Sequence, residues 1–118
     1  MNTENRKPYN NQTFDEIDKK AADQARFIKP VEGQPLILEF FPERTEIKSV
    51  DFQGDGELTD RVNFIVRDAT GKLKGEKEIS FGIPTARRIT TLLRRGINKL
   101  EVIRMGSGLN TKYDFIPA

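Results

Sequence analysis

The order of its strand-like and helical segments constrains the fold of this chain more than any other feature. Apolar and polar residues alternate with a period of two in several stretches, which is typical of strands that bury one face. The segments are, in order, strand-like Leu36–Phe52 with a bend at Pro42, Val62–Val66 and Leu73–Ile83, helical Pro84–Arg95, and strand-like Lys99–Met105 and Thr111–Pro117. We therefore predict a mainly β domain of order β-β-β-α-β-β, whose first strand is long and broken.

Five strands with one helix between the third and fourth is the order of the oligonucleotide/oligosaccharide-binding (OB) fold, a small Greek-key barrel. Turn signals separate the segments, at Gly54–Gly56 and at Asp68–Gly71, and no internal repeat competes with this interpretation. We assign residues 34–118 to a five-stranded OB-fold barrel. In such a barrel the second and third strands and the adjoining loops hold ligands.

Residues 1–33 are predicted to precede the barrel as a flexible tail with a short amphipathic helix. Met1–Gln12 has almost no apolar residues, whereas Thr13 and Glu16 form a capping box that starts a helix running to about Phe27. The apolar face of this helix is narrow and consists of Phe14, Ile17, Ala21, Ala25 and Ile28. Such a helix could dock on its own domain, bind a protein partner, or be only partly formed; docking is the ordinary outcome.

The helix at Pro84–Arg95 has two different faces. Pro84 and Gly96 mark its ends, because proline suits the first turn and glycine suits a left-handed stop. Its apolar face consists of Ala86, Ile89, Leu92 and Leu93, and its polar face of Arg87, Arg88, Thr91, Arg94 and Arg95. Four arginines without a carboxylate favour an anionic partner over a merely solvated face.

Charge is unevenly distributed along a chain whose net charge is only +2. Residues 31–83 carry seven basic and eleven acidic side chains, whereas residues 84–118 carry seven basic and two acidic ones. A local positive field attracts anionic polymers even when the total charge is small. The uneven pattern favours a polarised surface, and the small total charge argues against a histone-like coating protein.

The composition excludes most familiar catalytic centres. The chain has no cysteine and no histidine, and therefore no thiolate metal site, no disulfide and no histidine base. Four carboxylates surround the Gly54–Gly56 turn (Asp51, Asp55, Glu57 and Asp60), but their spacing does not match a calcium-binding EF-hand loop. We predict a protein that is not an enzyme and needs no cofactor or metal.

No apolar run approaches the roughly 20 residues that span a bilayer, and no signal peptide is recognisable. We therefore expect no membrane partner. The expected location is intracellular, either cytoplasmic or, for a viral protein, in the host cytoplasm.

Binding of a single nucleic-acid strand needs cations along a groove and flat rings on which bases stack. Side chains of both kinds follow the predicted second, third and closing strands. The predicted nucleic-acid-binding residues are Arg61, Asn63, Arg67, Lys74, Lys77, Phe81, Arg104, Thr111, Lys112 and Tyr113. Phenylalanines in so small a barrel more often fill the core, while the Tyr113 hydroxyl favours a solvent-facing position.

The stretch Ile103–Phe115 resembles the closing strands of small single-stranded-DNA-binding proteins of phages and some archaea. There a hydrophobic strand ends in Arg, a Gly-x-Gly loop follows, and Thr-basic-Tyr opens the final strand; here these are Arg104, Gly106–Gly108 and Thr111–Tyr113. The resemblance implies sequence-tolerant binding of single strands through Arg104, Thr111, Lys112 and Tyr113. The chain departs from that pattern in having no Trp and in ending Phe-Ile-Pro-Ala rather than in an acidic tail.

The sequence thus predicts non-enzymatic binding of single-stranded DNA, largely independent of base sequence, in replication, recombination or repair. Two alternatives stay open at this point. The barrel could be a protein-interaction module that uses the Phe14–Ile28 helix, or it could bind single-stranded RNA. The oligomeric state and the role of the four helix arginines do not follow from the residues alone.

Overall fold

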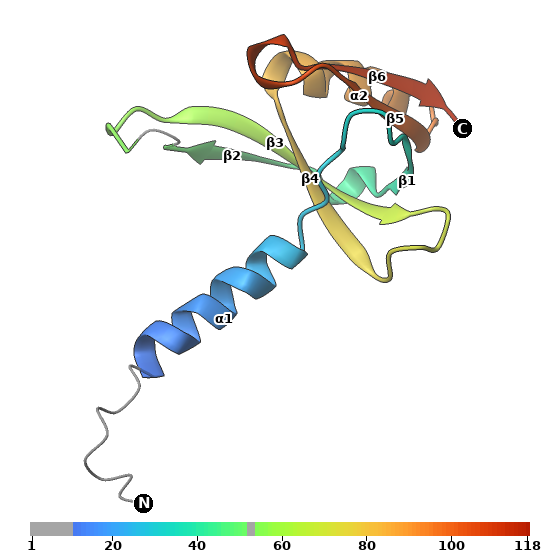
Figure 1. The fold of residues 1–118 in the computed structure, drawn as a ribbon. Coiled ribbons are helices and arrows are strands. Elements are labelled where there is room, and N and C mark those ends of the chain that lie inside the picture. The colour runs from blue at the N-terminus through green and yellow to red at the C-terminus, as the bar shows by residue number, and fades with distance from the viewer. Residues whose placement is uncertain (1–10, 52–53) are drawn as a thin grey trace, which may run out of the picture.

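The computed structural model describes residues 11–51 and 54–118, apart from the side chains of residues 23 and 24. In this part of the chain, one open antiparallel sheet of six strands lies with two α-helices (Figure 1). The strands are β1 (Leu36–Phe40), β2 (Glu46–Val50), β3 (Thr59–Asp68), β4 (Glu76–Gly82), β5 (Lys99–Met105) and β6 (Lys112–Pro117), and the helices are α1 (Asn11–Ala25) and α2 (Ile83–Arg94). The prediction of a mainly β fold is confirmed.

The long broken strand of the prediction is two strands, β1 and β2, joined by a short 3-10 turn, η1 (Pro42–Arg44). Pro42 has no backbone N–H to give to a ladder, so pairing stops there and the chain bends. The predicted end of this segment at Phe52 lies outside the described residues. Because of the bend, one strand of the expected barrel contributes two separate strands to the sheet.

Strand β3 organises the sheet. It pairs with β4 along one edge, and along its other edge with β2 through its first half and with β1 through its last three residues. Strand β1 continues to β5, and β5 to β6. The apolar face of β3 follows the prediction, since Val62, Phe64 and Val66 are buried, but Asn63 of its predicted polar face is buried as well.

The sheet is not closed, because β4 and β6 do not pair in the described part of the chain. The segment that follows α1 lies at this opening instead. The Ile28 N–H donates to the Glu78 carbonyl of β4 at 2.8 Å, and the Glu78 N–H donates to the Arg26 carbonyl at 2.6 Å. The strand pairing therefore does not form the closed barrel that the sequence predicts.

One hydrophobic core lies between the sheet and α2. Its largest fully buried side chains are Phe40, Phe64, Leu38, Ile79, Ile89, Leu100, Val66 and Val102. Each such side chain stabilises the fold by about 1.5–3 kcal/mol relative to full exposure. Ile83, predicted to end the buried face of a strand, is instead the first residue of α2 and is exposed.

Helix α2 has the predicted faces and ends. Ala86 and Ile89 are buried, and Leu92 and Leu93 pack partly against the core. Gly96 follows the helix with φ of 80°, a left-handed conformation that a side chain disfavours. The prediction of this helix from its termini and its apolar stripe is confirmed.

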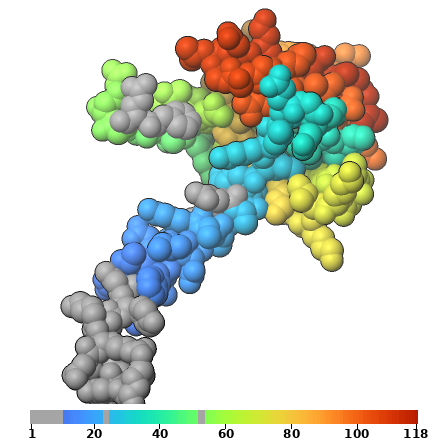
Figure 2. All heavy atoms as spheres, in the orientation of Figure 1, coloured from blue at the N-terminus to red at the C-terminus, as the bar shows by residue number. Residues whose placement is uncertain are grey.

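Helix α1 projects away from the sheet, so the expected docking on its own domain is wrong for this structure (Figures 1 and 2). Ile17 of its apolar stripe is 56% exposed. Two details of the predicted helix are also wrong. Thr13 lies inside α1, which already includes Asn11 and Gln12 of the predicted tail, and Ile28 lies beyond α1, buried in the core. Ile28 is buried because the segment after α1 pairs with β4 and carries it inward.

Candidate nucleic-acid interface

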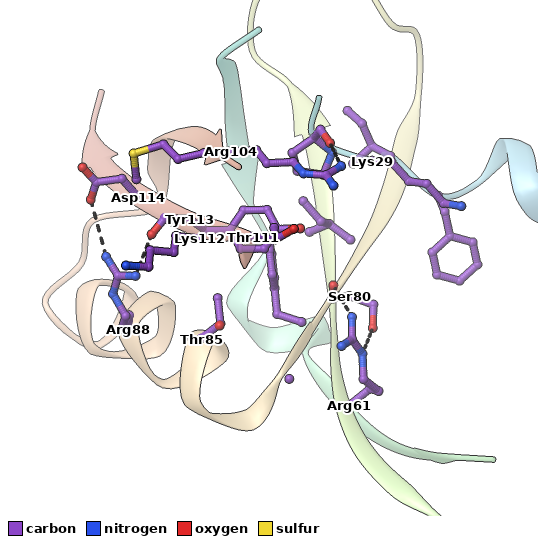
Figure 3. Close-up of a pocket in the computed structure, with 17 residues that line it drawn as sticks. Lys29, Arg61, Ser80, Thr85, Arg88, Arg104, Thr111, Lys112, Tyr113 and Asp114 are labelled. Carbon is purple, nitrogen blue, oxygen red and sulfur yellow. Dashed lines mark hydrogen bonds and ion pairs between the residues drawn. The ribbon is translucent and has the colours of Figure 1, made fainter. Parts of the chain in front are cut away.

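A cavity of about 870 Å³ lies at the opening between β4 and β6. Its walls come from residues 27–30, the start of β3, the end of β4, the first turns of α2, and the β5–β6 hairpin (Figure 3). We call it the seam groove. Because no strand pairs across the opening, side chains from segments far apart in sequence face one another there.

Cations dominate the charged residues of the seam groove. Its lining includes five basic side chains, Lys29, Arg61, Arg88, Arg104 and Lys112. Asp114 is the one acidic residue among the lining residues, and Arg88 pairs with it at 3.4 Å. The groove is therefore a place of positive potential in a chain of small net charge, and it suits an anion.

Two of these arginines are fixed by neighbouring strands. Arg61 on β3 donates to the Ser80 hydroxyl at 3.2 Å and to the Ser80 carbonyl at 2.9 Å. Arg88 on α2 donates to the Tyr113 carbonyl at 2.7 Å, and its guanidinium lies 5.3 Å from the centre of the Phe115 ring. Lys29 and Lys112, in contrast, are exposed and can move toward a ligand.

Arg104 is the most unusual cation of the seam groove. Its Nη1 donates to the Pro30 carbonyl at 3.1 Å, which ties β5 to the segment after α1 (Figure 3). Its Nε is buried, and no acceptor for it is present among the described residues. A buried donor without a partner costs about 1–3 kcal/mol, and more when it is charged. An anionic oxygen that reached Arg104 Nε would remove this cost.

The aromatic residues of the groove differ in accessibility. Phe81 is only 2% exposed, and its ring meets those of Tyr113 and Phe115 edge-on, with centroids 5.0 and 5.6 Å away. Phe81 therefore belongs to the core, as is usual for a phenylalanine in a small barrel. Tyr113 and Phe27 are partly exposed in the groove lining, and they are the rings on which a base could stack.

The structure brings six of the ten predicted binding residues to the seam groove, namely Arg61, Phe81, Arg104, Thr111, Lys112 and Tyr113. The other four lie elsewhere. Asn63 is buried, Arg67 is paired with Glu39, and Lys77 donates to the Ala25 carbonyl at 2.9 Å. Lys74 lies with Arg67 in a separate depression beside the β3–β4 turn. On the predicted polar face of β3, Arg61 therefore lines the groove, Asn63 is buried and Arg67 is in an ion pair.

Sequence reasoning missed Phe27, Lys29 and Arg88 as groove residues. Phe27 and Lys29 fell in the predicted helix end and linker, and only the pairing of this segment with β4 brings them to the opening. Arg88 was predicted on a face for an anionic partner, but its guanidinium turns toward β6. The other three arginines of that face, Arg87, Arg94 and Arg95, are exposed.

The loop between β5 and β6 borders the groove and has little room for a side chain at Gly106. Gly106 has φ of 78°, and a Cβ atom there would lie 2.4 Å from the Asn110 carbonyl oxygen. The loop then forms a single 3-10 turn, η2 (Gly108–Asn110). This tight geometry holds Thr111 and Lys112 at the rim of the groove.

Three of the carboxylates near the Gly54–Gly56 turn, those of Asp51, Asp55 and Asp60, accept hydrogen bonds from nearby groups. Asp51 accepts the Gly54 and Gly56 N–H groups at 2.7 and 2.9 Å, and Asp60 accepts the Ser49 hydroxyl at 2.8 Å. Among the described residues there is no group of three or more acidic side chains arranged to hold a metal ion. Within the same residues, neither helix has the length and apolar content needed to cross a membrane.

Comparisons with family models, curated proteins and solved structures give no match for this chain. Any functional conclusion therefore depends on the geometry and chemistry of its own residues.

Proposed function

We propose that this chain is a non-enzymatic single-stranded-DNA-binding protein of the OB-fold kind, which holds a strand in the seam groove. The observation that carries the proposal is the groove itself, where five cations meet two partly exposed rings. One of these cations is Arg104, whose buried Nε has no partner among the described residues. Phosphates suit the cations, and unpaired bases suit the rings.

The order of strand pairing supports the fold assignment within this proposal. If β1 and β2 are taken as one strand, the described residues contain every neighbour pair of an OB-fold barrel except the one that closes it. The missing pair is β4 with β6, and the seam groove lies at that place. In this interpretation the barrel is open where its ligand enters.

The proposal also predicts that single strands bind more tightly than duplexes. Tyr113 and Phe27 are partly exposed rings that suit unpaired bases, whereas a duplex keeps the faces of its bases stacked inside. Stacking and phosphate contacts do not depend on base identity, so we expect tolerance of base sequence. Single-stranded RNA offers the same phosphates and bases, and comparison of dT and rU oligonucleotides of equal length separates the two.

The test compares two double variants that remove the same charge. Lys29→Gln with Lys112→Gln removes two exposed cations from the groove, whereas Arg94→Gln with Arg95→Gln removes two exposed cations outside its lining. Affinity for a fluorescent dT oligonucleotide is measured against salt concentration. The groove variant should bind more weakly and lower the magnitude of the log–log salt slope by about 1.4, since each phosphate contact contributes about 0.7.

The α2 variant should keep the slope of the parent protein. Equal losses in both variants, equal affinity for duplex and single strands, or no binding at low salt would each contradict the proposal. The last result would favour a protein-interaction module instead, for which the exposed Ile17 of α1 is the supporting observation.

A further inference from the structure

The outer edge of β2 is a surface that the seam groove does not involve. Strand β2 pairs with β3 from Glu46↔Asn63 to Val50↔Thr59, and no strand in the described residues pairs with its other edge. Figures 1 and 2 show β2 and the first half of β3 as an arm that projects from the body of the molecule. A free edge of this kind presents N–H and C=O groups to a further strand.

Ile47 places an exposed apolar side chain on this edge strand. It lies directly opposite Val62, so both side chains are on the core-facing side of the sheet. Val62 is 6% exposed, but Ile47 is 68% exposed. One apolar side chain on β2 thus extends the core-facing side of the sheet onto the arm, past the point where the core ends.

The charged side chains of β2 would meet opposite charges on an antiparallel copy of the same strand. Glu46 and Lys48 flank Ile47 and lie on the opposite face of the strand from it. Lys48 Nζ lies 3.9 Å from Glu46 Oε2. An antiparallel copy of the strand, turned about an axis through Ile47, would place an acidic side chain opposite a basic one on both sides of that axis. Opposite charges across strands are stabilising, and like charges are destabilising.

We propose that β2 pairs with β2 of a second copy of this chain, antiparallel and about a two-fold axis at Ile47. In this register Ile47 lies beside the partner's Ile47, Glu46 lies opposite the partner's Lys48, and Lys48 opposite the partner's Glu46. The neighbouring register, centred on Lys48, is disfavoured because it places two lysines opposite each other. A C2 contact of this kind closes on itself and stops at a dimer.

This inference stands apart from the proposed function, since none of the β2 residues lines the seam groove. It has a consequence for that function all the same. A dimer carries two grooves, and a strand long enough to reach both would bind through an increased effective concentration. A strand that reaches only one groove would gain nothing.

Sedimentation velocity of the full chain without nucleic acid, over about three decades of protein concentration, tests the pairing. The 13.5 kDa chain should pass from monomer to dimer as the concentration rises. Ile47→Lys should abolish the dimer. Leu58→Lys is the matched control, because Leu58 is also 68% exposed and precedes β3 on the same arm, outside β2. Monomer at every concentration, or an equal effect of both variants, would overturn the proposal.

A charge exchange tests the register. Glu46→Lys alone and Lys48→Glu alone should each weaken dimerisation by about tenfold, because each puts like charges opposite one another. The double variant Glu46→Lys with Lys48→Glu restores opposite charges and should restore the dimer. Single variants without effect, or a double variant that stays monomeric while its circular dichroism matches the parent, would overturn the pairing.

Discussion

Asp68 is a buried polar residue that satisfies backbone N–H groups of the turn after β3. Asp68, at the end of β3, is 6% exposed, and its carboxylate accepts the Thr70 hydroxyl at 2.6 Å, the Thr70 N–H at 2.9 Å and the Leu73 N–H at 3.0 Å. The hydrogen bond from the Thr70 side chain, followed by the backbone hydrogen bonds, lowers the pKa of Asp68 below its usual value. The β3–β4 hairpin is therefore built around one ionised carboxylate.

Acid should weaken the fold through Asp68. Since its pKa is lower in the folded chain than in the unfolded one, its contribution is present above the unfolded value of about 3.9 and is lost as pH falls through the folded pKa. Asp68→Ala should cost about 1–3 kcal/mol at pH 7 in urea unfolding and should flatten the pH dependence below about pH 4. Asp55→Ala is the control, because Asp55 accepts one backbone N–H in an exposed turn. Equal costs for both variants would show that burial of Asp68 is not the reason.

At the scale of elements, α2 holds the last strand as well as covering the core. Arg88 reaches the backbone of β6 at Tyr113 and lies over the Phe115 ring, while its neighbour Arg87 is exposed on the same helix. Strand β6 pairs with β5 on one edge, and Arg88 contacts it at the edge that faces the seam groove. One arginine therefore supports a wall of the groove from outside the sheet.

Removing this contact should loosen β6. Arg88→Ala should lower the free energy of unfolding by about 1–2 kcal/mol through loss of a charged hydrogen bond and a cation–π contact. Amide hydrogen exchange should rise at Tyr113 and Phe115 before it rises in β3. Arg87→Ala should change stability by less than about 0.5 kcal/mol, since surface substitutions on helices seldom do more. The same change in both variants would mean that helix propensity, and not the contact, is measured.

At the scale of the whole molecule, the folded domain begins before the boundary at residue 34 that the sequence predicts. Ile28 is 8% exposed and belongs to the core, and the Arg26–Ile28 backbone pairs with β4. Helix α1 projects from this point and leaves Ile17 exposed. The structural unit and the projecting helix are therefore separated close to Arg26.

Deletion of residues 1–25 should leave the domain folded, with a melting temperature within a few degrees of the parent protein. Ile28→Ala in the full chain should instead cost about 2–5 kcal/mol, because it opens a cavity in the core. Thermal unfolding followed by circular dichroism at a β-sheet wavelength compares the two. A deletion as costly as Ile28→Ala would show that α1 contributes to the core.

The local pattern of residues predicts most elements of this fold. Alternation identifies the strands, Pro42 marks the break between β1 and β2, and Pro84 and Gly96 mark the ends of α2. These signals are readable because each depends on residues within one turn or a few positions along one strand. Six of the ten predicted binding residues also meet in one groove, since most lie on the segments that border the opening.

The pairing of segments that are distant in sequence decided the rest. Whether β4 meets β6, whether residues 26–28 lie beside β4, and which way Arg88 turns all depend on contacts between segments tens of residues apart. Regularly spaced apolar residues indicate that one face of an element is buried, but they do not indicate which segment packs against that face. For that reason the sequence determines the strands and α2, and only the folded chain determines the groove, the free edge of β2 and the place of Ile28.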